Sequence, residues 1–320
     1  MLVSIGLVVV GLILLAGGGE VLLRGAVGLA RRLDLTPAVI GLTVVAAGTS
    51  VPELAVSVLA SLRDNTDIAV ANVVGSNIIN TTFILGLAAI IAPLAVTGNM
   101  IRLEYPVAVL VTLMCVAIAD DGVINRKDAA VFLATYVGFT AYLVSIVREH
   151  MQRGEREQLD GQVEDLTPSS ESVPLLSRSI LYITVGVVLL AAGAEATVRG
   201  AVELGRLLGL SERIIGLTIV AAGTSLPEVV TSVIAAMRGR DDIAIGNIIG
   251  SNLFNILVIL GTSALVAPLQ VAPEIRDWDL YWALGTILLL FPLMRSSMKI
   301  QRGEGALLLG VYGLYLFFLF

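Results

Sequence analysis

The sequence predicts an all-α membrane protein with ten transmembrane helices, arranged as two inverted repeats of five helices. Three observations predict this fold class: the composition, the recurrence of long apolar segments, and an internal repeat. Of the 320 residues, 57% are hydrophobic and only 14% are charged, whereas soluble domains carry about 25% charged residues. The mean hydropathy of +0.92 agrees with this. We therefore expect lipid to surround the chain.

Ten apolar segments are long enough, or nearly so, to cross about 30 Å of hydrocarbon. They cover approximately residues 2–30, 37–61, 67–93, 104–119, 128–147, 178–208, 213–237, 243–267, 279–294 and 304–320. The first is interpreted as a spanning helix rather than a removed signal, because no small-residue cleavage site leads into a soluble domain. The chain thus divides into a first half at residues 1–147, a hydrophilic linker at 148–177, and a second half at 178–320.

The two halves repeat one another at an offset of 175 residues. Residues 41–57 read GLTVVAAGTSVPELAVS and residues 216–232 read GLTIVAAGTSLPEVVTS, with twelve of seventeen positions identical. A second block, DIAVANVVGSNIIN at 67–80, returns as DIAIGNIIGSNLFN at 242–255. Because five spans are an odd number, the second half enters the membrane from the opposite side. This is the inverted-repeat architecture of secondary transporters.

Charge indicates both the orientation and the classes of partner. With the loops assigned alternately to the two sides, basic residues divide twelve to six. The positive-inside rule then predicts that linker 148–177 is cytoplasmic, that both termini are external, and that the chain is a multi-pass protein of the cell membrane. The net charge of −6 argues against a nucleic-acid partner, and no obligate protein partner is evident. A single cysteine, Cys115, and a single histidine, His150, exclude the usual zinc sites and histidine-dependent triads.

Glu53 and Glu228 each lie near the middle of an apolar span, at matching positions of the repeat. A charged side chain there costs roughly 2.5–3.5 kcal/mol on insertion scales. No Lys or Arg lies in the central part of either segment to pair with it. We interpret the two carboxylates as a cation site, in preference to two protonated structural glutamates.

Proline residues next to these glutamates predict broken helices. Pro52 lacks an N–H and clashes with the carbonyl of Gly48, and Pro227 does the same to Gly223. Backbone carbonyls around Ala46–Thr49 and Ala221–Thr224 should thereby be freed, and in lipid they need a partner. A metal ion can be that partner.

The second repeated block supplies neutral oxygens. Its candidate site residues are Ser76, Asn80, Ser251 and Asn255. Asn77 and Asn252 belong to the same block, and for them hydrogen bonding between helices is the alternative role. Calcium prefers six to eight oxygen ligands, and the absence of thiolate and imidazole ligands disfavours zinc and copper. Two carboxylates carry a formal charge of −2, which one calcium ion or two sodium ions neutralise, so competition for them is a physical basis for ion exchange.

These paired motifs, GTSVPE with GSNIIN and GTSLPE with GSNLFN, resemble the α-repeats of the sodium/calcium exchanger family. The whole chain resembles its compact prokaryotic members. The resemblance implies a calcium site formed by Glu53, Glu228 and the carbonyls of Thr49 and Thr224. It implies flanking sodium sites that use Ala46 and Ser76 on one side and Ala221 and Ser251 on the other, with Asn80 at the centre. The complete predicted ligand set is Glu53, Glu228, Thr49, Thr224, Asn80, Asn255, Ser76, Ser251, Ala46, Ala221, Ser50 and Ser225.

The resemblance also implies electrogenic exchange of three sodium ions for one calcium ion, no bound cofactor, and sliding of the first and sixth helices. Many prokaryotic members carry Asp where this chain has Asn255. Without that third carboxylate the centre has no further charge to recruit potassium, so we expect no potassium requirement. The small residues Gly17–Gly19 and Ala191–Ala194 suit sliding or, equally, static packing.

Three local features complete the expectations. Glu20 with Arg24, and Glu195 with Arg199, are spaced for ion pairs within a helix. Asp67 and Asp242 are predicted to cap the third and eighth helices, with attraction of ions at each mouth as the alternative role. Residues 120–122, with the sequence DDG, are predicted to form a turn.

Competing interpretations remain open on sequence alone. A proton/calcium antiporter, or an antiporter of another cation, is the first, because carboxylates bind protons as readily as sodium. An intramembrane enzyme such as a carboxylate protease is the second, although no HExxH or GxGD context exists. A passive channel is the third, although proline-broken helices around carboxylates favour tight coordination over fast conduction.

Overall fold

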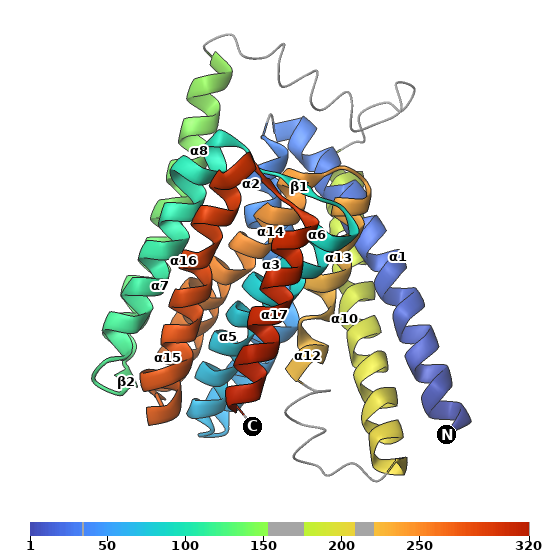
Figure 1. Ribbon diagram of the computed structural model, residues 1–320, viewed down its shortest axis with the longest axis vertical. Helices are drawn as coiled ribbons and strands as arrows, with labels where there is room; N and C mark the ends of the chain where they lie inside the picture. The colour runs from blue at the N-terminus through green and yellow to red at the C-terminus, as the bar shows by residue number, and fades with distance from the viewer. Residues whose placement is uncertain (34, 153–175, 209–220, 320) are drawn as a thin grey trace.

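The computed structural model describes residues 1–33, 35–152, 176–208 and 221–319, and it is an all-α bundle (Figure 1). The helices of the first half are α1 (Leu2–Leu33), α2 (Pro37–Ile40), α3 (Ala46–Thr49), α4 (Val51–Leu62), α5 (Thr66–Ile79), α6 (Leu85–Ile91), α7 (Tyr105–Ala119) and α8 (Arg126–Gln152). Those of the second half are α10 (Leu176–Leu207), α12 (Ala221–Thr224), α13 (Leu226–Met237), α14 (Asp241–Phe254), α15 (Gly261–Val266), α16 (Leu280–Ser297) and α17 (Arg302–Leu319). Short π-helical segments occupy Gly41–Val45, Asn80–Ile84, Met100–Glu104, Asn255–Leu260 and Ile275–Asp279.

Seven of the described helical segments are long and apolar enough to span a membrane. An eighth candidate consists of two helices, residues 38–49 and 51–62, which meet at an angle of 49°. The expected fifth segment is present as the continuous helix α8. Residues 213–220 of the expected seventh segment, and residues 153–175 of the expected linker, lie outside the described residues. The all-α polytopic fold class is therefore confirmed.

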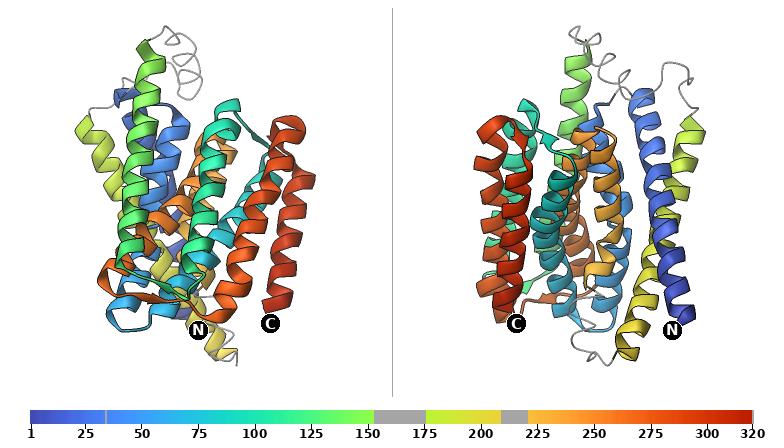
Figure 2. Two further views of the ribbon diagram at one scale, coloured as in Figure 1. Left: turned by 90° about the vertical axis from the view of Figure 1, so that its left-hand side faces the viewer. Right: turned by 45° about the vertical axis from the view of Figure 1, so that its right-hand side comes forward.

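Helices α1 and α10 form an antiparallel pair at one side of the bundle (Figures 1 and 2). Glycines recur every seven residues on the facing sides, at Gly11, Gly18 and Gly25 of α1 and at Gly186, Gly193 and Gly200 of α10. A Cβ added at Gly186 would lie 2.6 Å from the Leu22 nitrogen, and one added at Gly193 would lie 2.8 Å from the Gly11 oxygen. Such close backbone approach requires glycine on both helices.

The antiparallel contact between α1 and α10 is direct evidence of inversion. Gly18 contacts Leu190, whereas Gly25, one heptad further along α1, contacts Ile183, earlier in α10. These two helices are each other's counterparts in the repeat, because Gly18 and Gly193 are 175 positions apart. The two halves therefore cross the bundle in opposite directions.

Two short sheets join the halves at opposite ends of the bundle. β1 (Leu94–Ala95) pairs antiparallel with β4 (Lys299–Ile300), and β2 (Val123–Ile124) pairs antiparallel with β3 (Leu269–Gln270). Figure 1 shows β1 near one end and β2 near the other. Each sheet takes one strand from each half, so the bundle is tied across the repeat at both faces.

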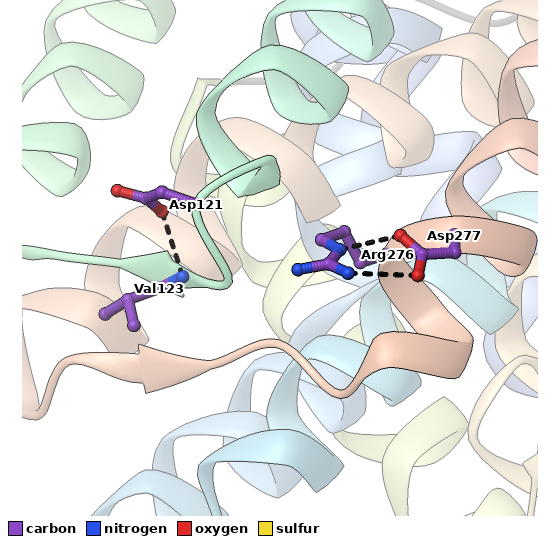
Figure 3. A network of polar contacts seen from close by, with 4 residues as sticks. All are labelled: Asp121, Val123, Arg276 and Asp277. Carbon is purple, nitrogen blue, oxygen red and sulfur yellow. Dashed lines mark hydrogen bonds and ion pairs between the residues drawn. The ribbon is translucent and has the colours of Figure 1, made fainter.

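The predicted turn at residues 120–122 precedes β2 and is confirmed. Gly122 has a positive φ of 83°, which glycine tolerates without steric cost. The Asp121 carboxylate accepts a hydrogen bond from the Val123 nitrogen at 3.0 Å. Beside this turn, Arg276 forms a bidentate ion pair with Asp277 (Figure 3).

The predicted capping role of Asp67 and Asp242 is wrong. Helix α5 begins at Thr66 and α14 begins at Asp241, so both aspartates lie inside the first turn. The residues that precede them make a different contact. The Asp241 carboxylate accepts a hydrogen bond from the Ala95 nitrogen at 2.9 Å, and the Thr66 hydroxyl accepts one from the Gln270 nitrogen at 3.1 Å. The two helix starts are thus anchored to strands rather than capped.

The expected ion pairs within helices are confirmed, and a further one joins two helices. Arg24 Nε lies 3.0 Å from Glu20 Oε1, and Arg199 pairs with Glu195. In addition, Arg238 at the end of α13 reaches Glu20 of α1, with Nη2 3.0 Å from Oε2. Arg63 and Glu195 occupy the repeat positions that match Arg238 and Glu20. Within the described part of the chain, Arg63 and Glu195 make no ion pair with each other.

The glycines at the contact between α1 and α10 lead to a prediction with a matched control. A Cβ at Gly18 would lie 2.9 Å from the Leu190 nitrogen, whereas nothing lies within 4 Å of one at Gly17. We expect Gly18→Val to lower the free energy of unfolding by roughly 1–3 kcal/mol through overpacking. Gly17→Val carries the same change in helix propensity and should unfold close to the wild type. Thermal unfolding of the purified proteins in one detergent measures both, and equal losses would contradict the close packing of α1 on α10.

Candidate cation site

Two helices are interrupted at matching positions of the repeat. Ser50 separates α3 from α4 with φ −84° and ψ 12°, and Ser225 separates α12 from α13 with φ −85° and ψ 6°. Pro52 and Pro227 follow within the first two residues of α4 and α13, where a proline is tolerated. The predicted breaks are therefore present in both halves.

The breaks leave fewer free carbonyls than expected. Pro52 has no N–H, so the Gly48 carbonyl loses its usual helical donor. The Ala46 carbonyl, by contrast, accepts hydrogen bonds from the Ser50 nitrogen at 3.0 Å and from the Thr49 hydroxyl at 3.2 Å. The Ala46 carbonyl thus finds its hydrogen-bond donors within its own turn. If this carbonyl also bound a cation, its oxygen would have to do so while accepting two hydrogen bonds.

Glu53 and Glu228 are buried in the first turns of α4 and α13, each only 1% exposed. Helix N-termini favour negative charge. Each carboxylate also receives a hydroxyl from the opposite half. Ser50 donates to Glu228 Oε1 at 2.8 Å, and Ser225 donates to Glu53 Oε1 at 3.2 Å. The serine that precedes each glutamate in the sequence therefore donates a hydrogen bond to the glutamate of the opposite half.

Four asparagines form an amide network across the two halves: Asn77 and Asn252 near the ends of α5 and α14, and Asn80 and Asn255 at the start of the π-helical segments that follow them. Asn80 Nδ2 donates to Asn252 Oδ1 at 3.1 Å, and Asn255 Nδ2 donates to Asn77 Oδ1 at 2.9 Å. Asn77 Nδ2 donates to the Asn252 carbonyl at 3.2 Å. Asn77 and Asn252 therefore join the two helices, which is the alternative role that the sequence suggested for them.

Ser251 connects the amide network to the carboxylates. The Ser50 hydroxyl, which bonds Glu228, also lies 3.2 Å from the Ser251 hydroxyl. Ser251 precedes Asn252 in α14, which belongs to the most deeply buried candidate span among the described residues. Predicted ligand residues from the two halves, Ser50, Glu228 and Ser251, therefore meet beside the amide network.

Four oxygens of this cluster are buried without a hydrogen-bond donor. They are Glu53 Oε2, Glu228 Oε2, Asn80 Oδ1 and Asn255 Oδ1. A buried acceptor without a partner is costly, and the same type of atom recurs at matching positions of both halves. Within the described residues, no group of three or more Asp, Glu, His or Cys side chains is arranged to hold a metal. A cation here would be bound by two carboxylates together with neutral oxygens.

The remaining predicted residues lie on the same helices or beside the two helix breaks. Thr49 is buried and its hydroxyl also reaches Asn247 Oδ1 at 3.3 Å. Ser76 and Ser251 are buried in α5 and α14. Thr224 ends α12 and is half-buried, and Ala221 is the first residue of that helix.

Two supporting residues were missed by the sequence reasoning. Asn72 Nδ2 donates to the Glu53 carbonyl at 3.3 Å and to the Ser57 hydroxyl at 3.0 Å. Its repeat counterpart Asn247 donates to the Ser232 hydroxyl at 2.9 Å. Both asparagines occupy the same position of the second repeated block, so their recurrence was the signal that could have identified them.

Comparison of the chain with known proteins identifies similar families, sequences and structures. The family described as sodium/calcium exchanger protein matches residues 3–145 and 178–320. The inner membrane protein YrbG of Escherichia coli is 35% identical over 322 residues, covering 100% of this chain and 98% of YrbG. The sodium/calcium exchanger MaX1 of Methanosarcina acetivorans is 30% identical, covering 98% of this chain and 97% of MaX1. The solved structure of the sodium-calcium exchanger NCX_Mj superposes with a TM-score of 0.84 at 30% identity, covering 100% of this chain and 99% of that one.

Proposed function

The chain belongs to the sodium/calcium exchanger family, and on this premise we propose that it is a secondary antiporter that exchanges sodium for calcium across the cell membrane. It is a membrane transport protein of a cation exchanger family and not an enzyme. The observation that carries the proposal is the set of four unpartnered, buried oxygens, two from each half. Carboxylate and amide oxygens without donors are ligands suited to a hard cation.

The charge of the site accounts for exchange. Glu53 and Glu228 are both buried and receive serine hydroxyls from the opposite half as side-chain donors. Their combined charge of −2 is neutralised by one calcium ion or by two sodium ions. We propose that calcium uses both glutamates with the carbonyls of Thr49 and Thr224. We further propose that sodium uses flanking positions that include Ser76 and Ser251.

We propose that access alternates by movement of the α1–α10 pair across the remaining helices. Glycines on the facing sides of these two helices allow close packing, and this packing keeps the two helices together as one unit. The ion pair of Arg238 with Glu20 fastens α1 to α13, whereas Arg63 and Glu195 are not joined within the described residues. In an inverted repeat, the opposite access state exchanges the conformations of the two halves. Formation of one pair should therefore accompany loss of the other.

We propose the membrane orientation as well. Figure 1 places both chain ends at one end of the bundle and the C-terminal end of α8 at the other. The relative YrbG is described as an inner membrane protein. Together with the excess of basic residues, this supports two functional halves, 1–147 and 178–320, joined by a cytoplasmic linker at 148–177.

Calcium-45 uptake tests the exchange itself. Proteoliposomes loaded with sodium and diluted into sodium-free medium should accumulate calcium, because outward sodium flux drives inward calcium flux. Uptake should be equal with potassium or choline as the companion ion, and an imposed pH gradient should not replace sodium. Uptake driven by the pH gradient would instead indicate proton/calcium exchange.

Glu53→Gln and Glu228→Gln are the variants to compare in the same assay. Glutamine keeps the shape of each side chain and removes the charge that the cation needs. Each variant should therefore abolish uptake without loss of folding, since removing an unpaired buried charge eases insertion. Near-normal uptake by both variants would exclude the site.

The orientation is tested by labelling. In a Cys115→Ala background, Asp160→Cys places a single thiol in the linker. An impermeant thiol reagent should label it in inverted vesicles and not in intact cells. Labelling of intact cells would reverse the assignment.

The two ion-pair positions predict mutually exclusive contacts. In the same background, Glu20→Cys with Arg238→Cys should react with a short bifunctional thiol cross-linker, and so should Arg63→Cys with Glu195→Cys. Each cross-link should stop uptake, because each would fix one access state. With all four cysteines present, reaction of one pair should suppress reaction of the other. Independent reaction of both pairs would contradict the exchange of conformations.

A further inference from the structure

The two ends of an asparagine amide are nearly identical in shape but opposite in chemistry. The oxygen can bind a cation, whereas the NH₂ group repels it. Asn255 is 1% exposed, and its Oδ1 is one of the four unpartnered oxygens of the site. Some neighbour must therefore select which end of Asn255 is presented to the ion. A carboxylate would need no such selection, because both of its ends are oxygen.

Hydrogen bonding fixes the amide orientations in a definite order. The Asn252 backbone carbonyl can only accept, so the Asn77 group that faces it at 3.2 Å must be Nδ2. Asn77 Oδ1 then faces Asn255, and only the NH₂ group of Asn255 can donate to it at 2.9 Å. The remaining end of Asn255, its oxygen, is left without a donor.

We propose that Asn77 is a positioning residue that holds Asn255 with its oxygen toward the transported cation. This inference rests on the proposed function of the site. Asn77 is only 5% exposed, so bulk solvent does not compete for its bond to Asn255. If the Asn255 amide reversed, two acceptor oxygens would face each other at the position of the present hydrogen bond.

The other half lacks this strict selection. Asn80 Nδ2 donates to Asn252 Oδ1, and Asn252 Nδ2 in turn donates to the Thr81 hydroxyl at 2.8 Å. A hydroxyl can donate as well as accept, so both amides could reverse together and remain hydrogen-bonded. The backbone carbonyl that anchors Asn77 makes Asn255 the more firmly oriented ligand. The repeat is therefore chemically asymmetric at its centre.

The same contact selects a neutral ligand at position 255. A carboxylate there would place an oxygen against Asn77 Oδ1, unless it took up a proton or the Asn77 amide turned and gave up its bond to the Asn252 carbonyl. Asn77 therefore favours an amide at this position and keeps the formal charge of the site at −2. The effect of Asn77 on ion binding should depend on whether residue 255 is an asparagine or an aspartate.

A double-mutant cycle tests this dependence. The four proteins are the wild type, Asn77→Ala, Asn255→Asp and the double variant, with Asn77→Ser as a smaller change should the alanine variant fail to fold. The readouts are the half-saturating calcium concentration of uptake and the calcium-induced rise in unfolding temperature in detergent. With Asn255 present, Asn77→Ala should weaken calcium binding roughly 10- to 100-fold, as is usual for residues that orient ligands. In the Asn255→Asp background, the same change should cost little or improve binding.

The repeat provides a matched control. Asn80→Asp introduces the same carboxylate in the other half and should not rescue Asn77→Ala. Equal losses in the wild-type and Asn255→Asp backgrounds, or equal rescue by Asn80→Asp, would overturn the positioning role and leave Asn77 as a packing residue. Calcium uptake by the wild type is measured independently, so its absence would refute the proposed function rather than this inference.

Discussion

The structure depends on one constraint, which is the burial of Glu53 and Glu228 in the middle of a membrane bundle. Each is 1% exposed, and each receives a serine hydroxyl rather than a basic side chain. Two carboxylates in such surroundings must bind cations or protons. The broken helices place them at helix N-termini, the serines hold one oxygen of each, and the other oxygen is left free. These features together leave buried acceptor oxygens without hydrogen-bond donors in both halves of the bundle.

Inversion of the repeat explains why one site is built from both halves. Ser50 precedes Glu53 but bonds Glu228, and Ser225 precedes Glu228 but bonds Glu53. These reciprocal hydrogen bonds require the two broken helices to meet in an antiparallel arrangement. The sheets β1–β4 and β2–β3 repeat this crossing at the two ends of the bundle. The residues of this cluster thus come from matching positions of both halves, and inverted-repeat transporters place their binding sites at such a repeat interface.

The departures from symmetry are as informative as the symmetry. At the periphery, Arg238 reaches Glu20 while the matching Arg63 and Glu195 are not joined within the described residues, so the two halves differ in conformation. At the centre, Asn77 is anchored on a backbone carbonyl, whereas Asn252 is anchored on the Thr81 hydroxyl. The first difference concerns the ion pairing of α1 with α13, and the second concerns how firmly each amide is held in one orientation.

The fold class, the inverted repeat, the helix breaks and the two glutamates could all be predicted from the amino-acid sequence. These follow from composition, an offset of 175 residues and the local effect of proline, all of which are properties of the chain alone. Three features could be read only from the packed helices: which oxygens have donors, the contacts of Asn72 and Asn247 beside the glutamates, and the absence of capping by Asp67 and Asp242. The reason is physical. A helix break depends on neighbouring residues, but the partner of a buried oxygen is set by segments that meet from opposite halves, some 170 to 180 positions apart.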